Sequence, residues 1–141
     1  MASITDPEVR AFLTEGTRTG KIAYTSADGR PLVVPVWFVL EGDTLVFNTG
    51  QGTAKARSIA RDPRVTLVVD LEEPPFGFVQ VQGEALVSED PGDLLRTATE
   101  IARRYMGAEL AEEFGRRNGV PGELVVRLRP TKVVAVMNLT D

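Results

Sequence analysis

The 141-residue chain has the length of one domain, and its 43% hydrophobic and 26% charged residues are ordinary for a globular protein. It contains no cysteine and no histidine, which excludes disulfides, cysteine nucleophiles, Ser-His-Asp triads and most transition-metal sites. With a net charge of −4, it also lacks the broad basic surface that nonspecific nucleic-acid binding needs. No leader sequence or membrane-spanning apolar run is visible, so we expect a cytoplasmic protein with neither a metal nor a membrane partner.

The first predicted elements are a short helix and a meander of strands. Residues 5–16 read TDPEVRAFLTEG, with Thr5 or Asp6 as the N-cap, a proline in the first turn and a closing glycine. Residues 21–49 then alternate three runs rich in Val, Phe, Tyr and Thr with Asp-Gly and Gly-Asp turns. This alternation predicts strands joined as hairpins.

One of these runs, VVPVWFVL at 33–40, is predicted to be a strand with two apolar faces. Such a strand must be covered on both sides. One face can fill a barrel, and the other then needs a partner subunit or a flat ligand, although a central core strand has the same pattern. Pro35 removes a backbone donor, which fits an edge strand or a bulge.

The rest of the chain adds helices and strands in turn. The predicted elements are a helix at 53–61, a strand at 64–71, a strand at 76–89, two helices within 90–117 divided near Gly107, and two strands within 123–139 separated by Arg129-Pro130. Adjacent strands joined by short turns favour a mainly β, antiparallel, Greek-key-like barrel with peripheral helices over a βαβ array. We expect a single domain spanning 1–141.

Within the predicted helices at 90–117, two patterns have ordinary structural interpretations. Ala98, Ile101 and Tyr105 recur at helical spacing, which is more typical of core packing than of a binding surface. Arg103 and Arg104, like the other arginines of this region, are balanced by nearby glutamates and indicate a solvated or interface face.

The segment NTGQGTAKARSIARDPRV, residues 48–65, concentrates positive charge in an acidic protein. Four basic residues against one aspartate give it a charge of +3. Thr53 is a natural N-cap, GQG leaves backbone amides unobstructed, and Lys55 lies near the helix start. Two interpretations compete, a solvated helix face and a phosphate site at a helix N-terminus.

The order of these features resembles the split β-barrel superfamily of flavin and deazaflavin proteins, which includes the pyridoxamine 5'-phosphate oxidases. The resemblance covers nearly the whole chain, through GKIAYTSADGRP, the NT–GT–K–R–DPRV series, VQVQGEA and LVVRLRPTKVVAV. It implies a homodimer with two cofactor sites at the subunit interface. The second apolar face of residues 33–40 would then be covered.

The resemblance also implies a set of cofactor-binding residues. The backbone of Val34, Pro35, Val36 and Trp37 would lie along the ring system, while Thr49, Thr53, Lys55 and Arg57 would surround the phosphate, with Asn48 and Ala54 beside them. The resemblance leaves two equal interpretations of Trp37: it stacks on the cofactor, or it packs in the core. Phe76 and Phe78 are candidates to line the pocket from the partner chain, with plain barrel core as the alternative.

Departures from the pattern bear on the cofactor. Val34 and Val39 stand where the FMN-dependent pyridoxamine phosphate oxidases carry Arg and Lys, Phe78 replaces a Gln, and the C-terminal Trp and Arg-x-His features are missing. The chain instead resembles the actinobacterial branch that uses coenzyme F420. That resemblance implies an oxidoreductase that transfers a hydride between the reduced deazaflavin and a small unsaturated or quinone-like substrate.

Three alternatives remain open at this point: an FMN-binding flavin reductase, oxidase or electron carrier on the same barrel, a non-catalytic F420 carrier, and a barrel that binds single-stranded nucleic acid. The last is disfavoured because aromatic residues are only 6% of the chain and its basic residues concentrate at one helix start. Lack of histidine and cysteine is no obstacle to hydride transfer, because the cofactor carries the reactive carbon.

Overall fold

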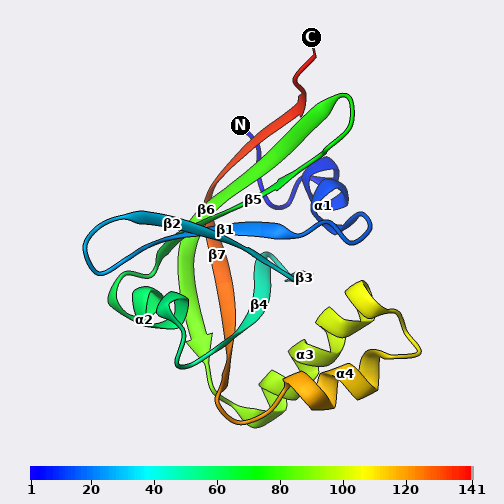
Figure 1. The fold of residues 1–141 in the computed structure, drawn as a ribbon. Helices are drawn as coiled ribbons and strands as arrows, with labels where there is room; N and C mark the ends of the chain where they lie inside the picture. The colour runs from blue at the N-terminus through cyan, green and yellow to red at the C-terminus, as the bar shows by residue number, and fades with distance from the viewer. Residues whose placement is uncertain (141) are drawn as a thin grey trace.

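The computed structural model describes residues 1–140 as seven strands and four helices. The strands are β1 (Gly20–Thr25), β2 (Pro31–Val36), β3 (Val39–Glu41), β4 (Thr44–Gly50), β5 (Arg64–Asp70), β6 (Phe76–Ser88) and β7 (Glu123–Asn138). The helices are α1 (Pro7–Thr14), α2 (Ala54–Arg61), α3 (Pro91–Met106) and α4 (Ala111–Asn118). All strands pair antiparallel in one sheet of order β2-β1-β5-β6-β7-β4-β3 (Figure 1).

The predicted mainly β barrel fold is confirmed, but the sheet is not closed. β2 and β3 follow each other along the chain, yet they occupy opposite edges of the sheet. The run 33–40 is therefore not one strand, and that prediction is wrong. The chain leaves β2 after Val36 and crosses to β3 through Trp37 and Phe38, because Phe38 is fully buried and anchors the crossing in the core. Pro35 does lie on an edge strand, since β2 pairs only with β1.

The two strands predicted within 123–139 are one continuous strand, β7. Its register against β6 shifts between Gln82, which faces Lys132, and Gly83, which faces Pro130, so Thr131 is an extra residue. This bulge accommodates a proline that has no N–H to donate to the ladder. Gly83 permits the close approach, because a Cβ there would lie 2.2 Å from the Arg129 carbonyl oxygen.

The core fills the inside of the curved sheet. Its fully buried side chains include Leu13, Ile22, Phe38, Phe47, Leu67, Val69, Val79, Val81 and Leu128. Val9 and Leu13 bring α1 into this core. α3 and α4 pack side by side (Figure 1). Gly115 of α4 has no room for a side chain, since a Cβ there would lie 2.1 Å from the Thr99 hydroxyl of α3.

An ion-pair network fixes the start of α3 against the sheet. Asp93 accepts two hydrogen bonds from Arg127 of β7, both of 2.7 Å. Glu41 of β3 accepts from Arg127 at 3.1 Å and from Arg96 at 2.9 Å. The hydrogen bonds from Arg127 lower the pKa of Asp93 to about 2. α3 is therefore held in place from its first turn.

Within residues 1–140, no helix combines the length and apolar character needed to cross a bilayer. The same part of the chain brings no three acidic side chains together in an arrangement suited to a metal ion.

Candidate functional site

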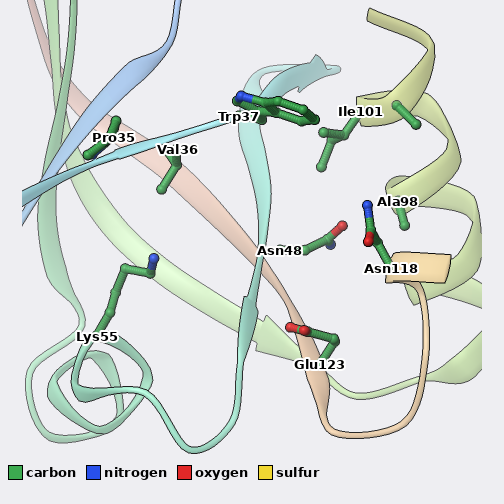
Figure 2. A pocket seen from close by; sticks show the side chains of 10 residues that line it. Pro35, Val36, Trp37, Asn48, Lys55, Ala98, Ile101, Asn118 and Glu123 are labelled. Atoms are coloured by element: carbon green, nitrogen blue, oxygen red, sulfur yellow. The ribbon is translucent and has the colours of Figure 1, made fainter. Parts of the chain in front are cut away.

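A cavity of about 270 Å³ lies where β2, β4, α2, α3, α4 and β7 meet. Its apolar lining is Pro35, Val36, Trp37, Ala98, Ile101 and Ala102. Its polar lining is Asn48, Lys55, Asn118 and Glu123 (Figure 2). The cavity thus joins the crossing between β2 and β3 to the positively charged start of α2.

Trp37 is held at the cavity by the last turn of α3. Its indole stacks on the Tyr105 ring, with centroids 4.9 Å apart and the planes within 4° of parallel. The Tyr105 hydroxyl accepts a hydrogen bond from the Phe38 N–H at 3.2 Å and donates one to the Arg18 carbonyl at 3.0 Å. Burial raises the pKa of this hydroxyl. Tyr105 therefore orients Trp37 rather than filling the barrel core.

Arg104 forms a clamp with Tyr105, so it does not lie on a solvated face, which is one of the two positions predicted for it. The other, an interface face, stays a prediction. The Arg104 guanidinium donates to the carbonyls of Phe38 at 2.7 Å, Leu13 at 2.8 Å and Gly16 at 3.0 Å. β2 and β3 are the two edges of the sheet and do not pair with each other, which leaves the barrel with an open seam between them. The Phe38 backbone lies between these two strands and, within residues 1–140, has no neighbouring strand to hydrogen-bond with. The Arg104 and Tyr105 side chains supply those hydrogen bonds instead.

The start of α2 has the predicted cap. The Thr53 hydroxyl accepts from the Ala56 N–H at 3.1 Å and lies 3.4 Å from the Thr49 hydroxyl. The backbone N–H groups of Ala54 and Lys55 have no acceptor within residues 1–140. The helix therefore presents free donors beside its positive dipole end.

Lys55 extends from α2 into the cavity (Figure 2). Its ammonium lies 5.9 Å from the centroid of the Phe47 ring and forms no salt bridge within the described residues. Burial lowers its pKa, and the negative charge of Glu123 partly opposes that effect. A half-buried cation with no ion-pair partner suits an anionic ligand group.

The predicted site residues separate into three groups. Pro35, Val36, Trp37, Asn48 and Lys55 line the cavity together, and Thr49 and Thr53 adjoin it through the capped helix start. Val34 packs against the core instead, Ala54 is exposed, and Arg57 is exposed and donates to the Gly52 carbonyl at 2.6 Å. Phe76 and Phe78 line a different hollow with Val68 and Leu139. Within one chain they do not reach the cavity.

Sequence reasoning missed the wall of the cavity that α3, α4 and β7 provide. Ala98 and Ile101 are buried as predicted, but they also border the cavity. Asn118 ends α4 and Glu123 begins β7. The sequence around each is typical of an ordinary boundary residue and does not indicate a binding role. The small side chains of Ala98 and Ala102, one turn apart, are the available signal that α3 leaves space at this face.

An open antiparallel barrel with a capped, positively charged helix start beside its cavity has the arrangement of a split-barrel protein. The family model for pyridoxamine 5'-phosphate oxidase matches residues 5–137, and the chain belongs to this family. The family resemblance drawn from the sequence motifs is thereby confirmed. It places the chain among flavin- and deazaflavin-type oxidoreductases.

Solved structures have the same fold. A conserved hypothetical protein of Mycobacterium tuberculosis is 22% identical with a TM-score of 0.82, over 94% of this chain and 84% of that one. An F420 reductase is 26% identical with a TM-score of 0.70, over 92% and 98%. A heme binding protein of Mycobacterium smegmatis is 20% identical with a TM-score of 0.75, over 100% and 57%. No functionally curated protein matches the chain.

Proposed function

We propose that this protein is a homodimeric, F420-binding oxidoreductase that transfers a hydride between the reduced deazaflavin and a small unsaturated or quinone-like substrate. The observation that carries the proposal is Lys55, a half-buried cation without an ion-pair partner, in a cavity that also presents Trp37. The likeness to an F420 reductase over 92% of the chain supports the choice of cofactor.

The residues present fit the phosphate end of such a cofactor. Lys55 supplies a full positive charge, and the unpaired N–H groups at the start of α2 supply hydrogen-bond donors. Thr49 and Thr53 place two hydroxyls beside the same turn. A phosphate here would gain charge-assisted hydrogen bonds without displacing an existing protein partner of Lys55.

The crossing from β2 to β3 fits the ring of a flat cofactor. Pro35 and Trp37 are exposed along the outer side of the edge strand, so a planar molecule can lie against their surface. A deazaflavin supplies the carbon that accepts or donates the hydride. The chain supplies an apolar wall that excludes water and a rigid frame, since the Arg104 and Tyr105 clamp holds Trp37 in place.

A second copy of the chain is the proposed cover for the outer face of the sheet. Five strands share this face, and the row Pro35, Lys21, Val68, Gln80 and Val134 crosses all of them in register. The positions two residues before and after these on each strand share the same face and are also mostly uncharged. Val33, one of them, is 62% exposed. Because the face ends at Pro35, a partner seated on it would border the cavity. Phe76 and Phe78 of the partner subunit remain candidates to reach it.

Fluorescence titration with F420 and with FMN tests the proposal. We expect F420 to bind more tightly, and Lys55→Ala to weaken binding by about tenfold to a hundredfold, the worth of a charge-assisted contact. Affinity should also fall as the pH rises toward the Lys55 pKa, which burial places below its usual 10.5. Arg129→Ala is the matched control, because Arg129 is exposed, pairs with Glu84 and does not line the cavity.

Other outcomes point to the alternatives. Purified protein that is yellow and binds FMN but not F420 would replace the deazaflavin with a flavin. F420 binding without turnover of any quinone would indicate a carrier. Lack of binding to both cofactors, or equal losses from Lys55→Ala and Arg129→Ala, would contradict the assigned phosphate site.

A further inference from the structure

Three polar side chains that line the cavity keep hydrogen-bonding atoms without a protein partner among residues 1–140. The Glu123 carboxylate and the Asn118 amide have no hydrogen-bond partner within residues 1–140. Asn48 donates its amide N–H to the Thr97 hydroxyl at 3.1 Å, which leaves its carbonyl oxygen free. Asn118 is exposed and the other two side chains are half-exposed, so water reaches these atoms and a polar ligand can replace that water. Their convergence gives the cavity hydrogen-bonding groups for a polar ligand.

The lining of the cavity changes in character from one end to the other. In Figure 2, Trp37 and Ile101 lie at one end, the Asn48 and Asn118 amides lie in between, and Lys55 and Glu123 lie toward the other end. A complementary ligand is apolar at one end, carries hydroxyl groups in its middle and bears an anion beside Lys55. The cavity, of about 270 Å³, is partly open, so a longer molecule can extend beyond it.

We infer that Asn48, Asn118 and Glu123 bind the polyhydroxylated chain that joins the ring of the cofactor to its phosphate. This inference rests on the proposed function. Carboxylate and amide oxygens accept hydrogen bonds from hydroxyls, and the Asn118 amide also donates. Glu123 adds a second effect, because its negative charge disfavours a phosphate on its own side of the cavity. The anion is thereby directed to Lys55 and the start of α2.

Three ligands separate the contribution of the hydroxyl chain from that of the anion. All three contain the F420 ring, and the ring nitrogen carries a methyl group in the first, a ribityl chain in the second and a ribityl phosphate in the third. The ratio of the ribityl to the methyl affinity measures the hydroxyl chain, and the ratio of the phosphate to the ribityl affinity measures the anion. Asn118→Ala and Glu123→Ala should each lower the first ratio by about three- to tenfold, the worth of one hydrogen bond. Asn118→Ala should leave the second ratio unchanged, and Glu123→Ala should raise it.

Lys55→Ala should give the opposite pattern, with only the second ratio reduced. Glu113→Ala is the control, since Glu113 is exposed on α4 and does not line the cavity. If none of the three ligands binds the unmodified protein, the proposed function itself fails. If they bind and the first ratio is the same in Asn118→Ala, Glu123→Ala and the control, the assignment of the hydroxyl chain is overturned.

Discussion

Trp37 and Tyr105 lie 68 positions apart in the chain, yet their rings stack 4.9 Å apart and within 4° of parallel. Trp37 belongs to the crossing between the two sheet edges, and Tyr105 belongs to the last turn of α3. The Tyr105 hydroxyl also bonds the backbone on both sides of the seam, at Phe38 and Arg18. The wall of the candidate site and the seam of the barrel are thus held by the same side chain.

The stacked pair predicts a spectroscopic signal, because Trp37 is the only tryptophan in the chain. Tyr105→Ala should shift its emission to the red and make it more accessible to acrylamide, since one face of the indole becomes exposed to water. Tyr105→Phe keeps the ring and should change the spectrum much less. F420 added to the unmodified protein should quench Trp37. Identical spectra for the alanine and phenylalanine variants would contradict the stacking.

The hydrogen bonds of Arg104 predict that replacing it lowers the stability of the fold, even when the replacement is lysine. Its guanidinium bonds three separate carbonyls, whereas a lysine ammonium cannot match that planar geometry. Arg104→Lys should lower the free energy of unfolding by about 1–3 kcal/mol, measured by urea denaturation. The neighbouring Arg103 is exposed, so Arg103→Lys should stay within about 0.5 kcal/mol of the unmodified protein. Equal losses would show that the three contacts contribute little.

The Asp93–Arg127 pair predicts an acid-dependent step in stability. The pKa of Asp93 is about 2 in the folded protein, below its ordinary 3.8, mainly because Arg127 donates hydrogen bonds to it. A lowered folded pKa stabilises the protein above about pH 4, and this contribution is lost as the pH falls from about 4 to about 2. Unfolding free energies of the protein and of Asp93→Asn should therefore differ at neutral pH and converge on acidification. Glu109→Gln, an exposed change, should run parallel to the unmodified protein throughout.

The part of the candidate site that could be predicted is the part encoded locally. Lys55, Thr53 and Asn48 lie within eight positions of one another, and the cap and charge pattern of a helix start is visible in sequence. Asn118 and Glu123 come from distant segments that the fold brings to the same cavity. Nothing in their own surroundings distinguishes them from ordinary boundary residues.

The errors in the fold have a similar origin. Residues 33–40 have the composition of one strand, and the break at Trp37 and Phe38 arises because Arg104 and Tyr105 satisfy the backbone there. Pro130 indicates a break between two strands, but Gly83 on the neighbouring strand lets the sheet continue through a bulge. In both cases a residue far along the chain reverses what the local pattern predicts.

The outer face of the sheet predicts a dimer that one charge can disrupt. Val134 lies on that face at the β7 end of the row, beside Gln80 of β6. Val134→Asp should give a monomer in sedimentation velocity, because burying an unpaired carboxylate at an interface costs several kcal/mol. It should also weaken F420 binding if the partner completes the site. Leu110→Asp, at an exposed position before α4, should leave both properties unchanged. A Val134→Asp variant that remains dimeric would place the interface elsewhere, and an unmodified protein that is monomeric with full F420 affinity would show that one chain suffices.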